Sequence, residues 1–248
     1  MKLKVLGSGS KGNSYLLYND DEILMLEAGV PFKEVLNALG GNIRKVKGCL
    51  VTHEHGDHAK FVKEVLSHGI KAYMTPGTRE YVMQHHRMGK MLTKPIPVET
   101  CKQFKIGNFT ILPFNTVHDA ADPCGFLINH PETGTVLFAT DTRCLPNTFS
   151  GLQNIMIECN YDEKMLEARE DIPDTLKDRI RESHMSVETC IEALQANNLA
   201  RVNNIILLHI SEGDGDPEGF KQAVQEATRK SVDCATKGLE MEFNQTPF

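Results

Sequence analysis

The sequence lacks the features of a membrane-bound or secreted chain. None of its apolar runs approaches the length that a membrane-spanning helix requires. The first residues, MKLKVLGSGSKGN, are rich in glycine, and their apolar part is too short for a secretory signal. We therefore expect a cytoplasmic protein without a membrane partner.

Paired cysteines are also lacking. The seven cysteines are odd in number, and no two of them stand at C-x-x-C spacing. This pattern argues against a disulfide framework and against a zinc site built from cysteines. It indicates a reducing compartment, in agreement with a cytoplasmic location.

The chain has no excess of positive charge. It carries 27 lysines and arginines against 33 acidic residues, for a formal net charge of −6, and its basic residues are dispersed. Such a surface repels a phosphate backbone at long range, although a local basic patch could overcome the repulsion. The charge therefore favours a small-molecule substrate without excluding nucleic acid as a partner.

What the chain does contain is short apolar strands interleaved with helices. Apolar residues make up 40% of the 248 residues, and no linker divides them, so we expect a single domain over residues 1–248. The predicted strands are residues 2–7, 14–19, 22–29, 46–52, 70–75, 109–115, 124–129, 135–141, 154–160 and 204–211. The predicted helices are residues 31–39, 58–68, 77–88, 174–183, 186–198 and 217–229. This alternation predicts sheet layers covered by helices.

Several predicted strands run directly into a potential metal ligand. These ligands are His53, His118, Asp141 and His209. Strand ends are rigid positions, and several of them can meet at one edge of a sheet. A single histidine after a strand is more often a polar cap than a ligand, so this pattern alone does not define a site.

The segment LVTHEHGDHAKF, residues 50–61, favours metal ligands over polar caps, because it groups three histidines and two carboxylates within six residues. Alternate residues of an extended segment point to the same side, so His53 and His55 can present their imidazoles together. Gly56 permits a sharp turn, which places Asp57 and His58 at the start of the following helix. Histidine and carboxylate are common ligands of zinc and related ions, and the two pairs could each hold a cation.

The six residues HEHGDH match the H-x-H-x-D-H signature of the metallo-β-lactamase superfamily. Further segments resemble its YycJ/WalJ-type branch, which is related to ribonuclease Z, and they occur in the same order along most of the chain: VLGSGSKGNSYLL, VHDAADPCGFLI, FATDTR, SHMS and LLHISE. The overall pattern is also similar to a phage branch that degrades cyclic nucleotides and counters Pycsar defence. If a phage encodes this chain, the resemblance implies a location in the host cytoplasm. The resemblance implies an α+β fold, the αββα four-layer sandwich, with the site at one edge of the two sheets. It also implies a homodimer.

The same resemblance implies two divalent metal ions per chain, with zinc favoured and manganese as the alternative. The residues that would hold the first ion are His53, His55 and His118. The residues that would hold the second ion are Asp57, His58 and His209. Asp141 would bridge the two ions.

The resemblance also assigns roles outside the set of metal ligands. His184, in SHMS, resembles a histidine that related phosphodiesterases place beside the scissile phosphate, and we predict catalytic roles for it and for Asp57. Glu158 resembles a carboxylate that supports the ligands, although a capped strand end explains it equally well. Glu27 stands where the family usually has aspartate. If Glu27 orients a metal-bound histidine, its extra methylene requires the local backbone to sit further back.

The segment GSGSKG, residues 7–12, satisfies the dinucleotide-binding pattern G-x-G-x-x-G, and Glu27 lies where a ribose-binding acid would be expected. Such a site needs a helix after the glycines, but residues 14–19 alternate like a strand. We therefore expect a tight turn. Its polar residues either line the site or serve only the turn, and they are Ser8, Ser10, Lys11 and Asn13.

The other histidines have no partner at metal-ligand spacing, and we predict structural or surface roles for them. His68 closes a predicted helix, His85 and His86 lie within one, and His130 lies in a predicted turn. The segment 77–95 is a candidate for helix packing, for a substrate lid or side pocket, or for a dimer contact.

A centre of two metal ions supplies hydroxide at neutral pH and neutralises charge on a transferring phosphoryl group. Asp57, Asp141 and His184 favour phosphodiesters over β-lactams or thioesters, because His184 could protonate a departing alkoxide. We predict a phosphodiesterase that hydrolyses 3′,5′-cyclic mononucleotides to linear monophosphates with broad base tolerance, as in immune evasion. The first alternative is a YycJ-type DNA exonuclease. The second, from another class, is a non-hydrolytic di-iron or metal-binding protein.

Overall fold

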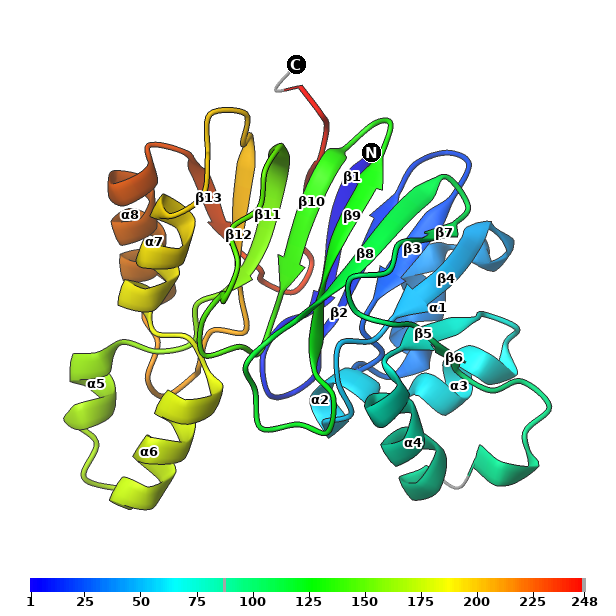
Figure 1. Cartoon of the computed structure of the whole chain (residues 1–248), viewed down its shortest axis with the longest axis horizontal. Helices are drawn as coiled ribbons and strands as arrows, with labels where there is room; N and C mark the ends of the chain where they lie inside the picture. The colour runs from blue at the N-terminus through cyan, green and yellow to red at the C-terminus, as the bar shows by residue number, and fades with distance from the viewer. Residues whose placement is uncertain (87, 247–248) are drawn as a thin grey trace.

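The computed structural model describes residues 1–86 and 88–246, and within them two sheets of seven strands pack face to face (Figure 1). The first sheet contains, in spatial order, β14 (Glu240–Glu242), β1 (Lys2–Gly7), β2 (Ser14–Tyr18), β3 (Ile23–Leu26), β4 (Val46–Leu50), β5 (Ala72–Met74) and β6 (Ile96–Pro97). The second contains β13 (Ser231–Cys234), β12 (Asn204–Leu208), β11 (Leu152–Glu158), β10 (Gly134–Ala139), β9 (Cys124–His130), β8 (Phe109–Asn115) and β7 (Phe104–Ile106).

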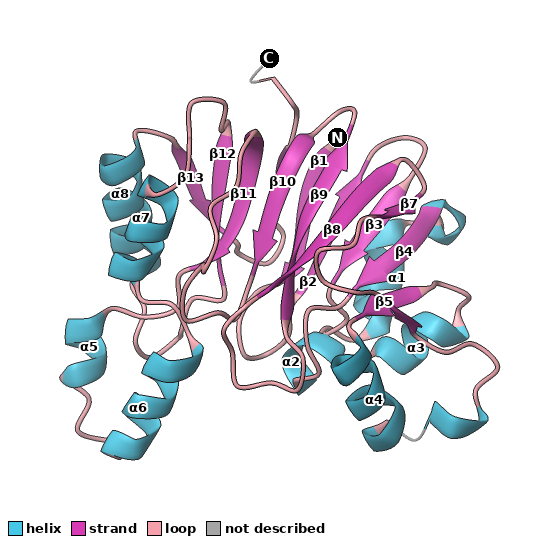
Figure 2. Ribbon diagram, in the orientation of Figure 1, coloured by secondary structure: helices cyan, strands magenta, loops and turns pink. Residues whose placement is uncertain are grey.

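Helices cover the outer face of each sheet (Figure 2). The described helices are α1 (Phe32–Leu39), α2 (Gly56–Ala59), α3 (Val62–Ser67), α4 (Pro76–His85), α5 (Glu163–Glu167), α6 (Asp174–Ser183), α7 (Val187–Gln195) and α8 (Pro217–Thr228), with 3₁₀ turns at Ile43–Lys45 and Met88–Lys90. Apolar residues of α1, α3 and α4 pack on the first sheet, and those of α7 and α8 pack on the second. The layers are therefore helix, sheet, sheet and helix, which confirms the predicted αββα sandwich.

Strand β3 shows why its sequence, ILML, carries no polar residue. Leu24 and Leu26 belong to the core between the two sheets, whereas Ile23 and Met25 belong to the core beneath the helices. Successive side chains of a strand point to opposite faces, and here both faces are covered. All four residues are buried as a result.

Parallel pairing gathers the strand ends at one edge of the sandwich. Strands β3, β4 and β5 run parallel, and so do β10, β11, β12 and β13. The residues that follow the carboxyl ends of parallel strands lie at the same edge of a sheet. The topology therefore brings together the segments that follow β4, β10 and β12, where the predicted ligands lie.

Some elements differ from the sequence-based prediction. The helix expected at 58–68 is interrupted, because the Phe61 amide donates to the Ala28 carbonyl (2.9 Å) and not to its own helix. His130 is not in a turn: it is the buried last residue of β9. The short elements β6, β7, β13, β14 and α5 had no predicted counterpart. Within the described residues, no helix is long and apolar enough to cross a membrane.

Candidate metal centre

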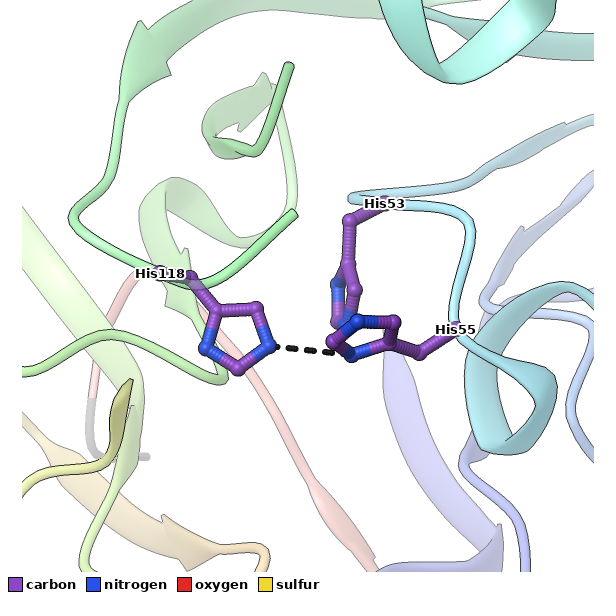
Figure 3. Close-up of side chains that lie close together, drawn as sticks. All are labelled: His53, His55 and His118. Carbon is purple, nitrogen blue, oxygen red and sulfur yellow. Dashed lines mark hydrogen bonds between the residues drawn. The ribbon is translucent and has the colours of Figure 1, made fainter. Parts of the chain in front are cut away.

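Three histidines from two distant segments face one another at this edge (Figure 3). His53 and His55 follow β4, and His118 follows β8. His118 Nε2 lies 3.1 Å from His55 Nδ1. One ring nitrogen from each histidine lies within 4.8 Å of one from each of the others, so the three could ligate one cation.

Two hydrogen bonds orient the rings of this group. His118 Nδ1 donates to the Ser183 carbonyl (2.7 Å), which leaves Nε2 as the unprotonated nitrogen that faces the group. The Nδ1 atom of His53 pairs with the Thr52 hydroxyl at 2.9 Å. Such outer contacts fix the tautomer and the direction of a ligating imidazole.

A second group lies beside the first and combines histidine with carboxylate. Its members, Asp57, His58, Asp141 and His209, place ligand atoms within 4.8 Å of one another. The Asp57 Oδ2 atom lies 3.2 Å from His58 Nε2 and 3.3 Å from His209 Nε2. Asp57 and His58 belong to the short helix α2, and His209 directly follows β12.

Asp141 lies between the two groups with one carboxylate oxygen toward each. Its Oδ1 is 3.2 Å from His58 Nε2 and 3.0 Å from His209 Nδ1. Its Oδ2 is 3.9 Å from the Nε2 atoms of both His53 and His118. This is the placement that a bridging ligand requires.

Two of the candidate ligands, Asp141 and His209, and the nearby Glu27 have a left-handed backbone conformation. Glu27, Asp141 and His209 have φ values of 66°, 44° and 52°, and each lies within two residues of the end of its strand. Non-glycine residues adopt this region rarely, and aspartate and histidine do so more readily than most. The turns carry the side chains out of the sheets and into the space between the two sheets' edges.

Two buried glutamates, Glu27 and Glu158, contact histidines of the site. Glu27 Oε2 lies 3.6 Å from His58 Nδ1, and its carboxylate also accepts from the Thr52 amide. Glu158 Oε1 accepts from His184 Nδ1 (2.6 Å) and lies 3.3 Å from His209 Nδ1. Glu27 therefore lies beside His58, and Glu158, at the end of β11, contacts both His184 and His209.

The two groups differ in charge. Burial lowers the pKa of His53 well below its usual range, an effect that nearby His58 reinforces, and burial lowers the pKa of His118. Burial also opposes protonation of His58 and His209, but the surrounding carboxylates, Asp141 and Asp57 foremost, together outweigh it and raise the pKa of both well above the usual range. His53 and His118 are thus neutral imidazoles, whereas His58 and His209 carry charge that compensates the buried carboxylates.

The donor set fits divalent ions. His53 Nε2 is buried and has no hydrogen-bond partner among the described residues, and an unpaired buried polar atom is costly. A cation at the three histidines would satisfy it. Histidine nitrogens and carboxylate oxygens suit zinc and manganese alike, so the residues fit two ions without selecting the metal.

A cavity of about 260 Å³ opens on these residues. Helix α6 forms one wall through Leu176, Arg179, Ile180 and Ser183. His184, which follows α6, and Asp57 are about one-fifth exposed at the cavity. Arg179 reaches the cavity from an exposed position, 3.6 Å from Asp119.

The α6 wall, including Arg179, was not predicted from the sequence. A signal was available, because α6 was predicted correctly and ends at His184. Of the turn residues, Asn13 Nδ2 contacts Asp57 Oδ2 (3.2 Å), Ser8 Oγ accepts from the His209 amide (3.0 Å), and Ser10 lines the cavity. No described residue of segment 77–95 lines this cavity.

Comparisons with known proteins agree with this geometry. A family model described as the β-lactamase superfamily domain matches residues 30–210. The chain belongs to this superfamily. It is accordingly a metal-dependent hydrolase with the metallo-β-lactamase fold.

Two relatives found by sequence and one solved structure show which members of the superfamily this chain is similar to. The exodeoxyribonuclease WalJ of Streptococcus pneumoniae is 28% identical over 222 residues, which is 85% of this chain and 82% of WalJ. The anti-Pycsar protein Apyc1 of a Paenibacillus species is 30% identical over only 71 residues, 26% of this chain and 29% of Apyc1. Among solved structures, YhfI of Bacillus subtilis has a TM-score of 0.72 at 18% identity, covering 97% of this chain and 99% of YhfI. WalJ and Apyc1 represent the two branches that the sequence resembles, and the likeness to YhfI shows the fold.

Proposed function

We propose that this member of the superfamily hydrolyses phosphodiester bonds and that its substrate is the end of a DNA strand. The observation that carries the phosphodiesterase proposal is the cavity, in which the ligand groups, His184 and Arg179 meet. When bound, two divalent ions would activate water and neutralise charge on the phosphate.

His184 is placed to serve the leaving group. Its Nδ1 donates to Glu158, so its Nε2 is free to contact a substrate in the cavity. A histidine held in this way can give a proton to the departing oxygen, as a general acid does. Its ring centroid lies 5.3 Å from those of both His118 and His209, next to the ligand groups.

Asp57 and Arg179 would act on the other partners of the reaction. Asp57 is one-fifth exposed and is held by Asn13, so its carboxylate can orient the attacking water. Arg179 is two-thirds exposed, and among the described residues its ion pair is a long one, with the exposed Asp119. A substrate phosphate could replace that aspartate, because arginine binds phosphate strongly.

The DNA substrate is supported by the relative that spans most of the chain. WalJ, named an exodeoxyribonuclease, aligns over 82% of its own length. The cavity's small size agrees with cleavage at a chain end, because about 260 Å³ leaves no room for more than one nucleotide. Ligand sites commonly occupy about 300–1,000 Å³.

The cyclic mononucleotide predicted from the sequence is the second candidate. The partial likeness to Apyc1 and the net charge of −6 favour it. Both substrates present a phosphodiester to the same residues, so the choice between them is one of size and of the number of phosphates contacted.

One experiment tests both candidates. The protein, loaded with Zn²⁺ or Mn²⁺, is incubated with linear duplex DNA, single strands, closed circular DNA and four cyclic mononucleotides. We expect mononucleotides from the linear DNA and no cleavage of the circle. Rapid cleavage of cyclic mononucleotides with linear DNA intact would instead support the second candidate. No cleavage of any phosphodiester by protein that contains both ions would refute the proposal.

A further inference from the structure

A second and larger cavity, of about 690 Å³, lies beside the metal centre. It is bounded by the glycine-rich turn at residues 7–12, the start of α1, the loop after β12 and the segment that begins at the end of β13. Ser10 lines both cavities, and His209 lines the first while its neighbour Ile210 lines the second. The two spaces are thus about one residue apart.

The glycine-rich turn gives this cavity a preformed wall. A side chain at Gly7 would begin 2.4 Å from the Gly12 carbonyl oxygen, and one at Gly12 would begin 2.5 Å from the Gly29 carbonyl oxygen. Asn13 then fixes the turn, because its Oδ1 accepts from the Gly9 amide at 2.8 Å. Asn13 also contacts Asp57, so the wall is tied to the metal centre.

The charges around the cavity are balanced. Lys11 pairs with Glu212 at 2.6 Å, and Lys237 pairs with Glu34 at 2.5 Å. These pairs are exposed, whereas the apolar lining residues Leu6, Val30 and Leu207 are buried. A cavity with buried apolar walls and paired charges at its rim suits a neutral, partly apolar group better than it suits a phosphate.

We propose that this cavity binds the nucleoside attached to the scissile phosphate. The inference rests on the proposed function and adds to it the place where the base and sugar lie. The metal cavity is lined mainly by histidines and charged side chains, which suit the phosphate better than a neutral base and sugar. The neighbouring space falls within the about 300–1,000 Å³ that is usual for small-molecule sites.

The test fills the cavity and compares two substrates with the same leaving group. Thr236 is an exposed lining residue, and Thr236→Trp would occupy the cavity with an indole ring. Thr93 is exposed and lines neither cavity, so Thr93→Trp is the matched control. The substrates are thymidine 5′-(p-nitrophenyl phosphate) and methyl p-nitrophenyl phosphate, which carries methyl in place of the nucleoside.

We expect Thr236→Trp to reduce the ratio of kcat/KM for the thymidine ester to that for the methyl ester by about tenfold or more, which corresponds to about 1.4 kcal/mol. Thr93→Trp should keep the wild-type ratio. Thermal unfolding and metal content, measured for each variant, show whether Thr236→Trp is folded and loaded. An unchanged ratio in folded, loaded Thr236→Trp would overturn the inference.

Free thymidine separates this inference from the proposed function, because its binding requires no hydrolysis. Titration calorimetry should show thymidine binding to wild type and to Thr93→Trp, and binding about tenfold weaker or more to Thr236→Trp. Binding of this kind without hydrolysis of either ester, of DNA or of a cyclic mononucleotide would refute the phosphodiesterase and retain the nucleoside site. Absent thymidine binding, or equal binding to all three proteins, would refute the site.

Discussion

Single residues at the metal centre hold backbone conformations that most residues avoid. Glu27, Asp141 and His209 all have positive φ, and a left-handed conformation costs a non-glycine residue roughly 1–2 kcal/mol. Strain of this kind persists where the surrounding structure fixes it, and it is common at functional sites. The three residues therefore trade some stability for the direction of their side chains.

The bridging position of Asp141 gives the first prediction. Asp141→Ala should weaken the binding of both ions, because its two oxygens face the two ligand groups. His209→Ala should remove mainly one ion, because His209 belongs to the second group and not to the three histidines of the first. Elemental analysis of protein loaded and then washed under identical conditions measures the number of ions per chain.

Asp119→Ala is the control for this comparison, since Asp119 lines the same cavity but is exposed and belongs to neither ligand group. It should keep both ions. One ion or none in loaded wild type would contradict the dinuclear centre, and equal losses in Asp141→Ala and His209→Ala would contradict the bridge.

His184 gives the second prediction. His184→Ala should keep both ions while turnover falls by roughly 10²–10⁴, the usual effect of losing a general acid. His85→Ala, which changes an exposed histidine stacked on Tyr81, should keep wild-type turnover. The measurements are kcat and metal content. Loss of metal together with activity would show that His184 is a ligand, and unchanged activity would show that it only ends α6.

At the scale of elements, the sequence predicts best where one local pattern decides the structure. The apolar run of β4 and the six residues HEHGDH predict a strand, a turn and the start of a helix, and each is present. The break between α2 and α3 depends on a carbonyl of Ala28, which lies outside the helical pattern. His130 is likewise held by Glu22, more than 100 residues away.

The site shows the same division between local and distant determinants. The ligand residue types and the ends of their strands are visible in the sequence. The pairing of His118 with the Ser183 carbonyl and the wall formed by α6 arise only when the second sheet places residues 118 and 174–184 side by side. Contacts between distant segments leave no periodic pattern, so sequence reasoning reaches them only through resemblance.

Close packing between elements gives the third prediction. A Cβ atom on Gly29 would lie 1.6 Å from the carbonyl oxygen of Asp57, so Gly29→Ala must displace the loop that carries the metal ligands. We expect a loss of stability of roughly 1–3 kcal/mol, as for other overpacked sites, together with weaker metal binding. Denaturant unfolding and elemental analysis measure the two effects.

Gly56→Ala is the matched control within the same loop. A Cβ atom on Gly56 would meet nothing within 4 Å, and Gly56 has no positive φ, so the turn does not require glycine there. We expect stability to stay within about 0.5 kcal/mol of wild type, as for exposed substitutions. A Gly29→Ala protein as stable and as metal-rich as Gly56→Ala would contradict the close contact.

At the scale of the whole molecule, the end opposite the metal centre joins the two sheets. Glu22 precedes β3, whereas Glu27 follows it. The Glu22 carboxylate is buried and accepts from the Asn108 amide (3.0 Å), the Asn108 side chain (2.6 Å) and His130 Nε2 (3.1 Å). His130 Nδ1 accepts from the Glu132 amide, which leaves Nε2 as the donor. One carboxylate of the first sheet thus binds two segments of the second.

This junction gives the last prediction. Burial raises the pKa of Glu22, but the hydrogen bonds from Asn108 and His130 outweigh it and lower that pKa below its ordinary value. Glu22→Gln should therefore cost roughly 1.5–3 kcal/mol at pH 7, the range for hydrogen bonds to a charged group. A carboxylate with a lowered pKa stabilises the folded state above its unfolded pKa of about 4.3, and this contribution is lost as the pH falls through the folded value. The difference in urea unfolding free energy between wild type and Glu22→Gln should thus be constant from pH 7 to about 5 and shrink below that.

Glu64→Gln is the control for this prediction. It changes an exposed position of α3 and should match wild type at every pH. A difference that persists unchanged or grows in acid would show that the Glu22 charge does not hold the sheets together.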